Sequence, residues 1–124
     1  MTKNFQVILE ASKRKALAAI ALVEASAHEL SPYDEKKNYT PKELEPYDAF
    51  CDRFIRAVEI CIKFFRSYEY YLSAVSSDTF RDLLQTMEKQ GVVSSVQIWM
   101  DMRDVRNRIV HDYVPSQIKE IYDL

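Results

Sequence analysis

The chain has 124 residues, of which 29% are charged and 48% hydrophobic, and its formal net charge is −2. This length predicts one domain over residues 1–124, and the slight negative charge excludes a generally basic nucleic-acid-binding coat. Gly91 is the only glycine, which excludes glycine-rich phosphate loops and favours helices over β-hairpins. No signal peptide or membrane span is predicted, so a cytoplasmic location with reduced cysteines is expected.

The first half of the chain begins with one long amphipathic pattern. Apolar residues at helical spacing predict a first helix over residues 4–30, followed by a polar loop over residues 31–39. Thr40 is the predicted N-cap of the next helix, and Glu43 is placed to close a capping box. Pro46 lacks a backbone N–H and clashes with the preceding turn. A short turn that ends before Pro46, and then a kink or restart, is therefore expected.

The second long helix is predicted over residues 46–75. It is apolar around most of its circumference, so it is central or faces both a core and a partner. It carries a run of aromatic side chains, namely Phe64, Phe65, Tyr68, Tyr70 and Tyr71. These rings could stack on bases, although packing in a core or interface is the favoured interpretation. Cys51 and Cys61 are about 15 Å apart along this helix, too far to form a disulfide with each other.

Two shorter helices are predicted in the second half of the chain. Residues 76–78, Ser-Ser-Asp, are predicted to cap a third helix over residues 79–90, which Gly91 ends. Ser94 is the predicted N-cap of a fourth helix, with a capping box, that runs to about residue 111 or 113. Pro115 stops it, and a short last helix follows. The predicted fold class is all-α: an up-and-down four-helix bundle with a short extra C-terminal helix.

The fourth predicted helix has two apolar sides with a charged arc beside them. One side is the expected core stripe of Ile98, Met102, Val105 and Ile109. The charged arc includes Asp101, Asp104, Arg108 and Asp112, with pairs expected at four-residue spacing. The other sector contains Val96, Met100, Arg103, Asn107, Val110 and His111. Valine and methionine gain nothing from facing water, so this sector is expected to meet a second protein surface in a homodimer.

The polar residues of this helix suggest cleavage of RNA by its own 2′-hydroxyl, without a metal or cofactor. His111 can transfer a proton near neutral pH, and Arg103 and Arg106 can hold a phosphate. Arg106 and His111 are five residues apart and diverge by about 140° on a helix, so a site between two copies of the chain is expected. On these residues alone, a polar network of Arg106, Asn107 and His111 at a helical interface is the favoured alternative.

The pattern Arg106-Asn107-x-x-x-His111-x-Tyr113 resembles the Arg-x4-His-x-Tyr motif of HEPN-domain proteins. It is most similar to the toxin of two-gene modules that pair a HEPN protein with a minimal nucleotidyltransferase. Residues 79–84 and the turn at Gly91 are also similar to that family, so the resemblance covers essentially the whole chain.

The resemblance implies a homodimeric helical bundle that acts as a toxin by metal-independent endoribonuclease activity at the dimer seam. It implies that Arg106 and His111 are catalytic, that Asn107 supports them, and that Tyr113 receives AMP from a cognate nucleotidyltransferase antitoxin. We count Arg103 as a further supporting residue. Relatives are also described as non-catalytic substrate-binding subunits of nucleotidyltransferases, which is the second interpretation. A helical dimerisation module without chemistry is the third.

Overall fold

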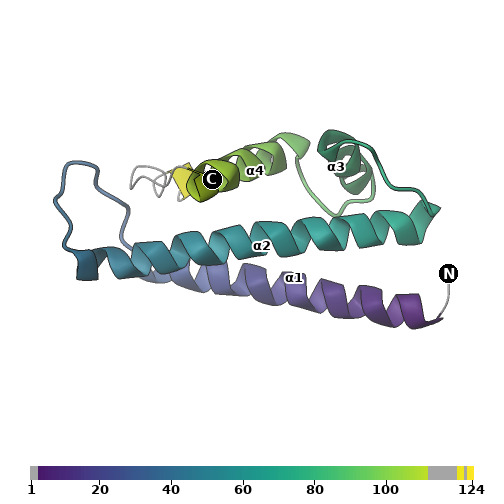
Figure 1. Ribbon diagram of the computed structural model, residues 1–124, viewed down its shortest axis with the longest axis horizontal. Coiled ribbons are helices and arrows are strands. Elements are labelled where there is room, and N and C mark those ends of the chain that lie inside the picture. Colours follow the sequence, from purple (N-terminus) through teal and green to yellow (C-terminus); the bar gives the residue numbers. More distant parts are fainter. Residues whose placement is uncertain (1–2, 112–119, 122) are drawn as a thin grey trace.

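The computed structural model describes residues 3–111, 120–121 and 123–124. Over these residues the chain forms four α-helices and no strand (Figure 1). They are α1 (Lys3–Glu29), α2 (Pro41–Ser73), α3 (Phe80–Lys89) and α4 (Val96–His111). The all-α prediction is confirmed. Of the predicted last helix, only residues 120 and 121 are described as helical, and the rest lies outside the described ranges.

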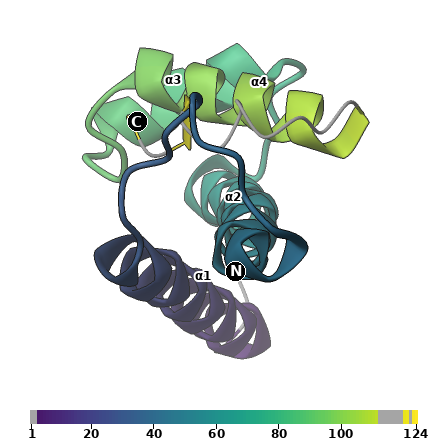
Figure 2. The same ribbon diagram turned by 90° about the vertical axis from the view of Figure 1, so that its left-hand side faces the viewer.

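The four helices are arranged around α2. The long helices α1 and α2 form an antiparallel pair, and α3 and α4 form a second layer on the other side of α2 (Figures 1 and 2). The helix α4 crosses α2 obliquely, so its contact with α2 is local (Figure 2). The prediction that the second long helix is central is confirmed. None of the described helices is long and apolar enough to cross a membrane.

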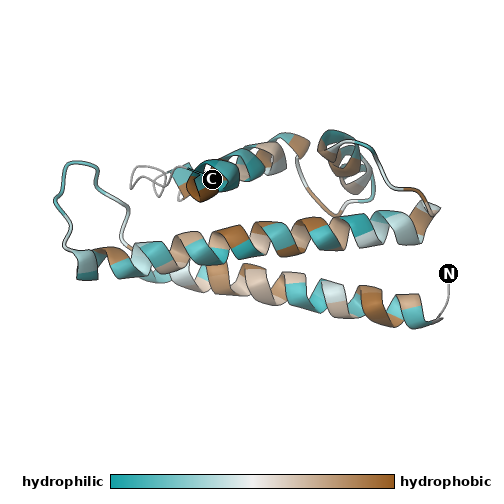
Figure 3. Cartoon of the chain, in the orientation of Figure 1, coloured by the Kyte–Doolittle hydropathy of each residue, from teal (hydrophilic) through white to brown (hydrophobic). Residues whose placement is uncertain are grey.

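Two apolar clusters lie between α2 and its neighbours. The first joins the N-terminal half of α2 to the C-terminal half of α4 and contains Tyr47, Phe50, Cys51, Phe54, Val58, Val105, Ile109 and Ile121. The second joins α2 to α3 and contains Ala16, Cys61, Phe65, Phe80, Leu83, Leu84, Met87 and Val93. Apolar positions recur along α2 for this reason (Figure 3). Each large apolar side chain buried in this way stabilises the fold by about 1.5–3 kcal/mol.

The two cysteines belong to different clusters. Cys51 and Cys61 are both buried and both free, which confirms that they do not bridge each other. Burial raises the pKa of the Cys61 thiol to about 11, because the thiolate loses its hydration. Cys61 therefore stays protonated at neutral pH and serves as a small apolar side chain.

The beginning of α2 differs from the prediction at Pro46. The capping box is confirmed, because the Thr40 hydroxyl accepts from the Glu43 N–H at 3.2 Å and the Glu43 carboxylate accepts from the Thr40 N–H at 3.1 Å. The helix then continues through Pro46, so the predicted short turn and restart are wrong. The missing N–H frees the carbonyl of Lys42, and both residues are exposed to water. Directly behind Pro46, buried Tyr47 holds the helix against the core.

The cap of α3 lies one residue later than predicted. Thr79, and not residues 76–78, is the N-cap, and its hydroxyl accepts from the backbone N–H three residues later at 3.1 Å. The predicted end at Gly91 is confirmed by a φ of 74°. The Gly91 N–H donates to the carbonyl of Glu88 at 3.0 Å, and the Val92 N–H donates to that of Met87 at 2.9 Å. These two bonds form a Schellman motif, which requires the left-handed backbone that glycine adopts without strain.

The start of α4 also differs by one residue. The Ser95 hydroxyl, and not that of Ser94, accepts from the Ile98 N–H at 3.3 Å. Gln97 closes no capping box, because its amide donates to Asp101 at 2.8 Å. Ile98 is 43% exposed, so its predicted place in the core stripe is wrong. The other three predicted members are confirmed, since Val105 and Ile109 are buried and Met102 is partly buried against the same cluster.

An apolar groove lies between α1 and α4. A cavity of ≈ 690 Å³ is lined by residues of α1, including Val23, of α4, including Met102, and of α2, including Phe54. Exposed apolar side chains continue along α1, namely Val7, Ile8, Leu17 and Leu22. From the sequence, apolar surface not covered within the chain was expected on α2 and α4. The structure places much of it on α1.

Candidate functional site

The helix α4 presents its polar motif along the edge where it crosses α2. Val105 and Ile109 are buried against α2 one turn apart and fix the rotation of α4. Because Arg106 and Asn107 directly follow Val105, they are held at the border between the two helices. This local arrangement places Arg106, Asn107 and His111 on α4 and gives Arg106 a fixed environment.

Arg106 is hydrogen-bonded to residues of both α4 and α2. Its Nη1 donates to Asn107 Oδ1 at 2.5 Å, and its Nη2 donates to Glu59 Oε1 at 2.5 Å. The Arg106 side chain is 29% exposed, and its Nε is buried with no hydrogen-bond partner among the described residues. The guanidinium is thus oriented by one neighbour on α4 and one on α2, with donor capacity left unused.

Glu59 is the site residue that the sequence did not reveal. It lies on the exposed side of α2 and pairs with Arg106, which comes 47 residues later in the chain. The sequence does show a charged stripe of Asp52, Arg56, Glu59, Lys63 and Arg66 at helical spacing on α2. That stripe marks an exposed face, but no local pattern indicates which of its members meets α4.

His111 occupies the last turn of α4 and is exposed. No hydrogen bond or ion pair joins it to Arg106 in the described part of the chain, in keeping with a separation of about 140° around the helix. A single chain therefore does not assemble the two residues around one phosphate. The polar network that was considered for all three motif residues joins Arg106 to Asn107 and leaves out His111.

Arg103 has a different surrounding from the one predicted. Its guanidinium lies over the Phe80 ring, with 4.6 Å from Cζ to the centroid. Val96 and Met100, on the same sector of α4, pack against the cluster around α3. These three residues are therefore half-buried within the chain, and contact of this sector with a second protein stays a prediction. Val110, at the other end of the sector, is 53% exposed.

The charged arc of α4 is confirmed where it is described. Arg108 pairs with Asp104 at 3.3 Å and with Glu120 at 2.6 Å. The hydrogen bond to Glu120 is the main cause of a raised pKa for Arg108, which stays a cation. The predicted partner Asp112 and the predicted modification site Tyr113 both lie outside the described residues.

The described residues contain no group of three or more histidine, cysteine, aspartate or glutamate side chains that could hold a metal ion.

Comparison with family models matches residues 15–124 to the family described as "Nucleotidyltransferase substrate binding protein like". Searches of curated proteins and of solved structures gave no match. Because the matched range includes α2, α3, α4 and most of α1, the chain belongs to the nucleotidyltransferase substrate binding protein-like family.

Proposed function

We propose that this chain works with a nucleotidyltransferase and is itself a metal-independent endoribonuclease, the toxin of a toxin–antitoxin module. The family description supports the partner, since it names relatives by their association with nucleotidyltransferases. The observation that carries the ribonuclease proposal is the oriented, half-buried guanidinium of Arg106 on the helix that also carries His111. Arginine in such a position offers paired donors to a phosphate.

The proposed reaction uses the nucleophile that RNA already carries. The 2′-hydroxyl attacks the adjacent phosphorus and the bond to the 5′-oxygen of the next nucleotide breaks, giving a 2′,3′-cyclic phosphate and a free 5′-hydroxyl. His111 takes the proton from the 2′-hydroxyl or returns one to the leaving oxygen. Arg106 stabilises the extra negative charge on the phosphorane oxygens, and Asn107 keeps its guanidinium oriented.

The proposal requires two copies of the chain. Because Arg106 and His111 point to different sides of α4, the Arg106 of one copy would act with the His111 of the other in a symmetric dimer. The exposed Val110 beside the motif and the apolar residues of α1 provide surface that a second copy could cover. The homodimer remains a prediction.

The first test replaces His111. His111→Ala is expected to abolish cleavage of RNA by the isolated protein without loss of helicity, while chelators leave wild-type cleavage unchanged. His28→Ala is the matched control, because His28 is also an exposed histidine in the last turn of a helix. Cleavage is measured by gel with end-labelled RNA. Equal cleavage by His111→Ala and wild type would refute the proposed chemistry.

Mixing two inactive variants tests the shared site. Arg106→Ala and His111→Ala proteins are each expected to be inactive, whereas their coexpressed mixture regains part of the wild-type activity. In the mixed dimer, one intact Arg106 faces one intact His111 from the other chain. Light scattering that gives a monomer, or a mixture as inactive as its components, would contradict a site at a dimer seam.

Tyr113 is the proposed point of control by the nucleotidyltransferase. Addition of AMP there would bring bulk and negative charge beside a site that binds phosphate, and would repel RNA. Incubation with the cognate nucleotidyltransferase and ATP is expected to add AMP-sized mass increments to wild type and to lower its cleavage. Tyr113→Phe keeps the ring and should gain no mass and stay active. Increments on both proteins would place the modification elsewhere.

A non-catalytic substrate-binding subunit is the second candidate. The Glu59–Arg106 ion pair favours it, because a phosphate must compete with this carboxylate for the arginine. The family description agrees with it as well. A binding subunit would leave RNA intact in the absence of its partner and would tolerate His111→Ala. The cleavage assay with the isolated chain therefore separates the two candidates.

A further inference from the structure

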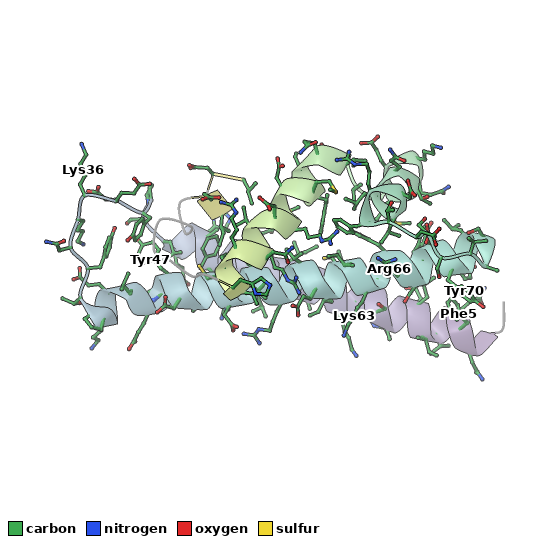
Figure 4. The ribbon with its side chains drawn as sticks, turned by 45° about the horizontal axis from the view of Figure 1, so that its top comes forward. Phe5, Lys36, Tyr47, Lys63, Arg66 and Tyr70 are labelled. Carbon is green, nitrogen blue, oxygen red and sulfur yellow. The ribbon has the colours of Figure 1, made fainter. Side chains whose placement is uncertain are left out.

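The exposed face of α2 continues away from Arg106 as a narrow stripe of four residues. Relative to Glu59, the residues Lys63, Arg66 and Tyr70 all fall within a sector of about 60° around the helix. They lie about 6, 10 and 16 Å beyond Glu59 along its axis. All three are exposed, so α3 does not cover them. Figure 4 shows these three side chains extending from successive turns of α2.

Within the described part of the chain, the charged residues of this stripe are paired up to Glu59 and unpaired beyond it. Before it, Arg56 is paired with Asp52, and Glu59 itself is paired with Arg106. After it, Lys63 and Arg66 have no hydrogen bond or ion pair with any described residue. Two unpaired cations side by side are notable in a chain whose formal net charge is −2. They form a local positive site that can attract a polyanion where the protein as a whole does not.

An aromatic ring stands at the far end of the stripe. Tyr70 is 44% exposed, and the Phe5 ring of α1 supports it with centroids 5.7 Å apart. The neighbouring Tyr71 is stacked with Phe5, with ring centroids 6.2 Å apart, and its hydroxyl accepts a hydrogen bond from Gln6. Tyr71 is therefore used within the fold, whereas Tyr70 keeps part of its ring surface in solvent, where a base can stack on it.

We propose that Lys63, Arg66 and Tyr70 form a binding track for single-stranded RNA that leads to Arg106. Lys63 and Arg66 contact phosphates next to the one held by Arg106, and Tyr70 stacks on a base farther along the strand. The track rests on the proposed ribonuclease function, for which it supplies the substrate class: unpaired RNA approaching along α2. Proteins that bind single-stranded nucleic acids usually contact the phosphates with cationic side chains and stack aromatic side chains on the bases.

Binding is measured by fluorescence anisotropy with a short 2′-O-methylated single-stranded oligonucleotide, which wild type cannot cleave because it lacks the nucleophile. Lys63→Ala/Arg66→Ala is expected to raise the Kd about tenfold. It should also lower the slope of log Kd against log salt by about 1.4, since each phosphate contact to a single strand contributes about 0.7. Tyr70→Ala should raise the Kd about fivefold without changing the slope.

The matched control is Arg14→Ala/Lys15→Ala, which removes the same charge from the exposed face of α1. Its Kd should stay within about twofold of wild type. Lys63→Arg/Arg66→Lys keeps both charges and should bind as wild type does. Circular dichroism checks that every variant is helical.

The outcomes separate the track from the ribonuclease. Wild-type binding by the Lys63→Ala/Arg66→Ala protein, an equal loss in the α1 control, or no binding by wild type would each overturn the track. Loss of nucleotidyltransferase binding with RNA binding intact would overturn it too, and would make the stripe a protein-docking surface. The expected binding pattern in a protein that cleaves no RNA would support the track and refute the ribonuclease.

Discussion

Two glutamates of α2 differ in burial and in the partners of their carboxylates. Glu69, near the end of the helix, is only 4% exposed and accepts hydrogen bonds from the N–H of Ser77, at 2.7 Å, and from its hydroxyl. The Glu59 side chain is 45% exposed and meets the cation Arg106. A buried carboxylate persists only when fixed donors satisfy it, whereas an exposed one can exchange its partner for water or a ligand. Glu69 therefore anchors the loop between α2 and α3, whereas Glu59 lies on the surface where we propose that RNA binds.

Removal of Glu69 tests the structural side of this comparison and should have the larger effect on stability. Glu69→Ala leaves the Ser77 donors without their acceptor and is expected to lower the free energy of unfolding by about 2 kcal/mol. Urea denaturation measures the change. Glu59→Ala, which removes an exposed ion pair from the same helix, should cost less than about 1 kcal/mol. Equal losses in the two variants would mean that burial does not distinguish the two carboxylates.

Neutralisation of Glu59 tests the functional side and should have a smaller effect. Glu59→Gln keeps an oxygen that can accept from Arg106 but removes the charge that competes with phosphate. RNA should bind up to about fivefold more tightly, the equivalent of about 1 kcal/mol for an exposed ion pair. Asp52→Asn is the control, since it removes the same charge from the Asp52–Arg56 pair on the same stripe. Weaker RNA binding by Glu59→Gln would show that the carboxylate positions Arg106 for substrate instead of competing with it.

Features encoded within a few residues could be predicted from the sequence. The Thr40–Glu43 capping box and the end of α3 at Gly91 depend on residue types three or four positions apart, and both are confirmed. Serine and threonine cluster before α3 and α4, so the sequence allowed several capping residues, and backbone geometry selected Thr79 and Ser95. The predicted break at Pro46 was wrong because the local cost of proline in a helix is smaller than the stability that the continuous helix gains from packing.

The environment of the site depends on packing that sequence spacing does not report. The motif on α4 was visible as a pattern, yet its Glu59 partner comes from another helix. Val96 and Met100 were correctly identified as apolar surface that needs a cover. Within the chain they pack against the second apolar cluster, to which the short helix α3 contributes fully buried Leu83 and Leu84. Periodicity identifies a face that must be covered, but not the element that covers it.

The capping box at the start of α2 makes the stability of this end of the molecule depend on pH. The pKa of Glu43 is lowered to about 2, first by the hydrogen bond from the Thr40 N–H and then by Lys37, whose ammonium lies 3.0 Å away. A depressed pKa means that this carboxylate favours the folded state fully above its ordinary pKa, and that its contribution is lost as the pH falls toward 2. Protonation would weaken both the hydrogen bond from the Thr40 N–H and the ion pair with Lys37 of the preceding loop. Acid therefore loosens the connection between the two long helices at the end of α2 opposite Glu69.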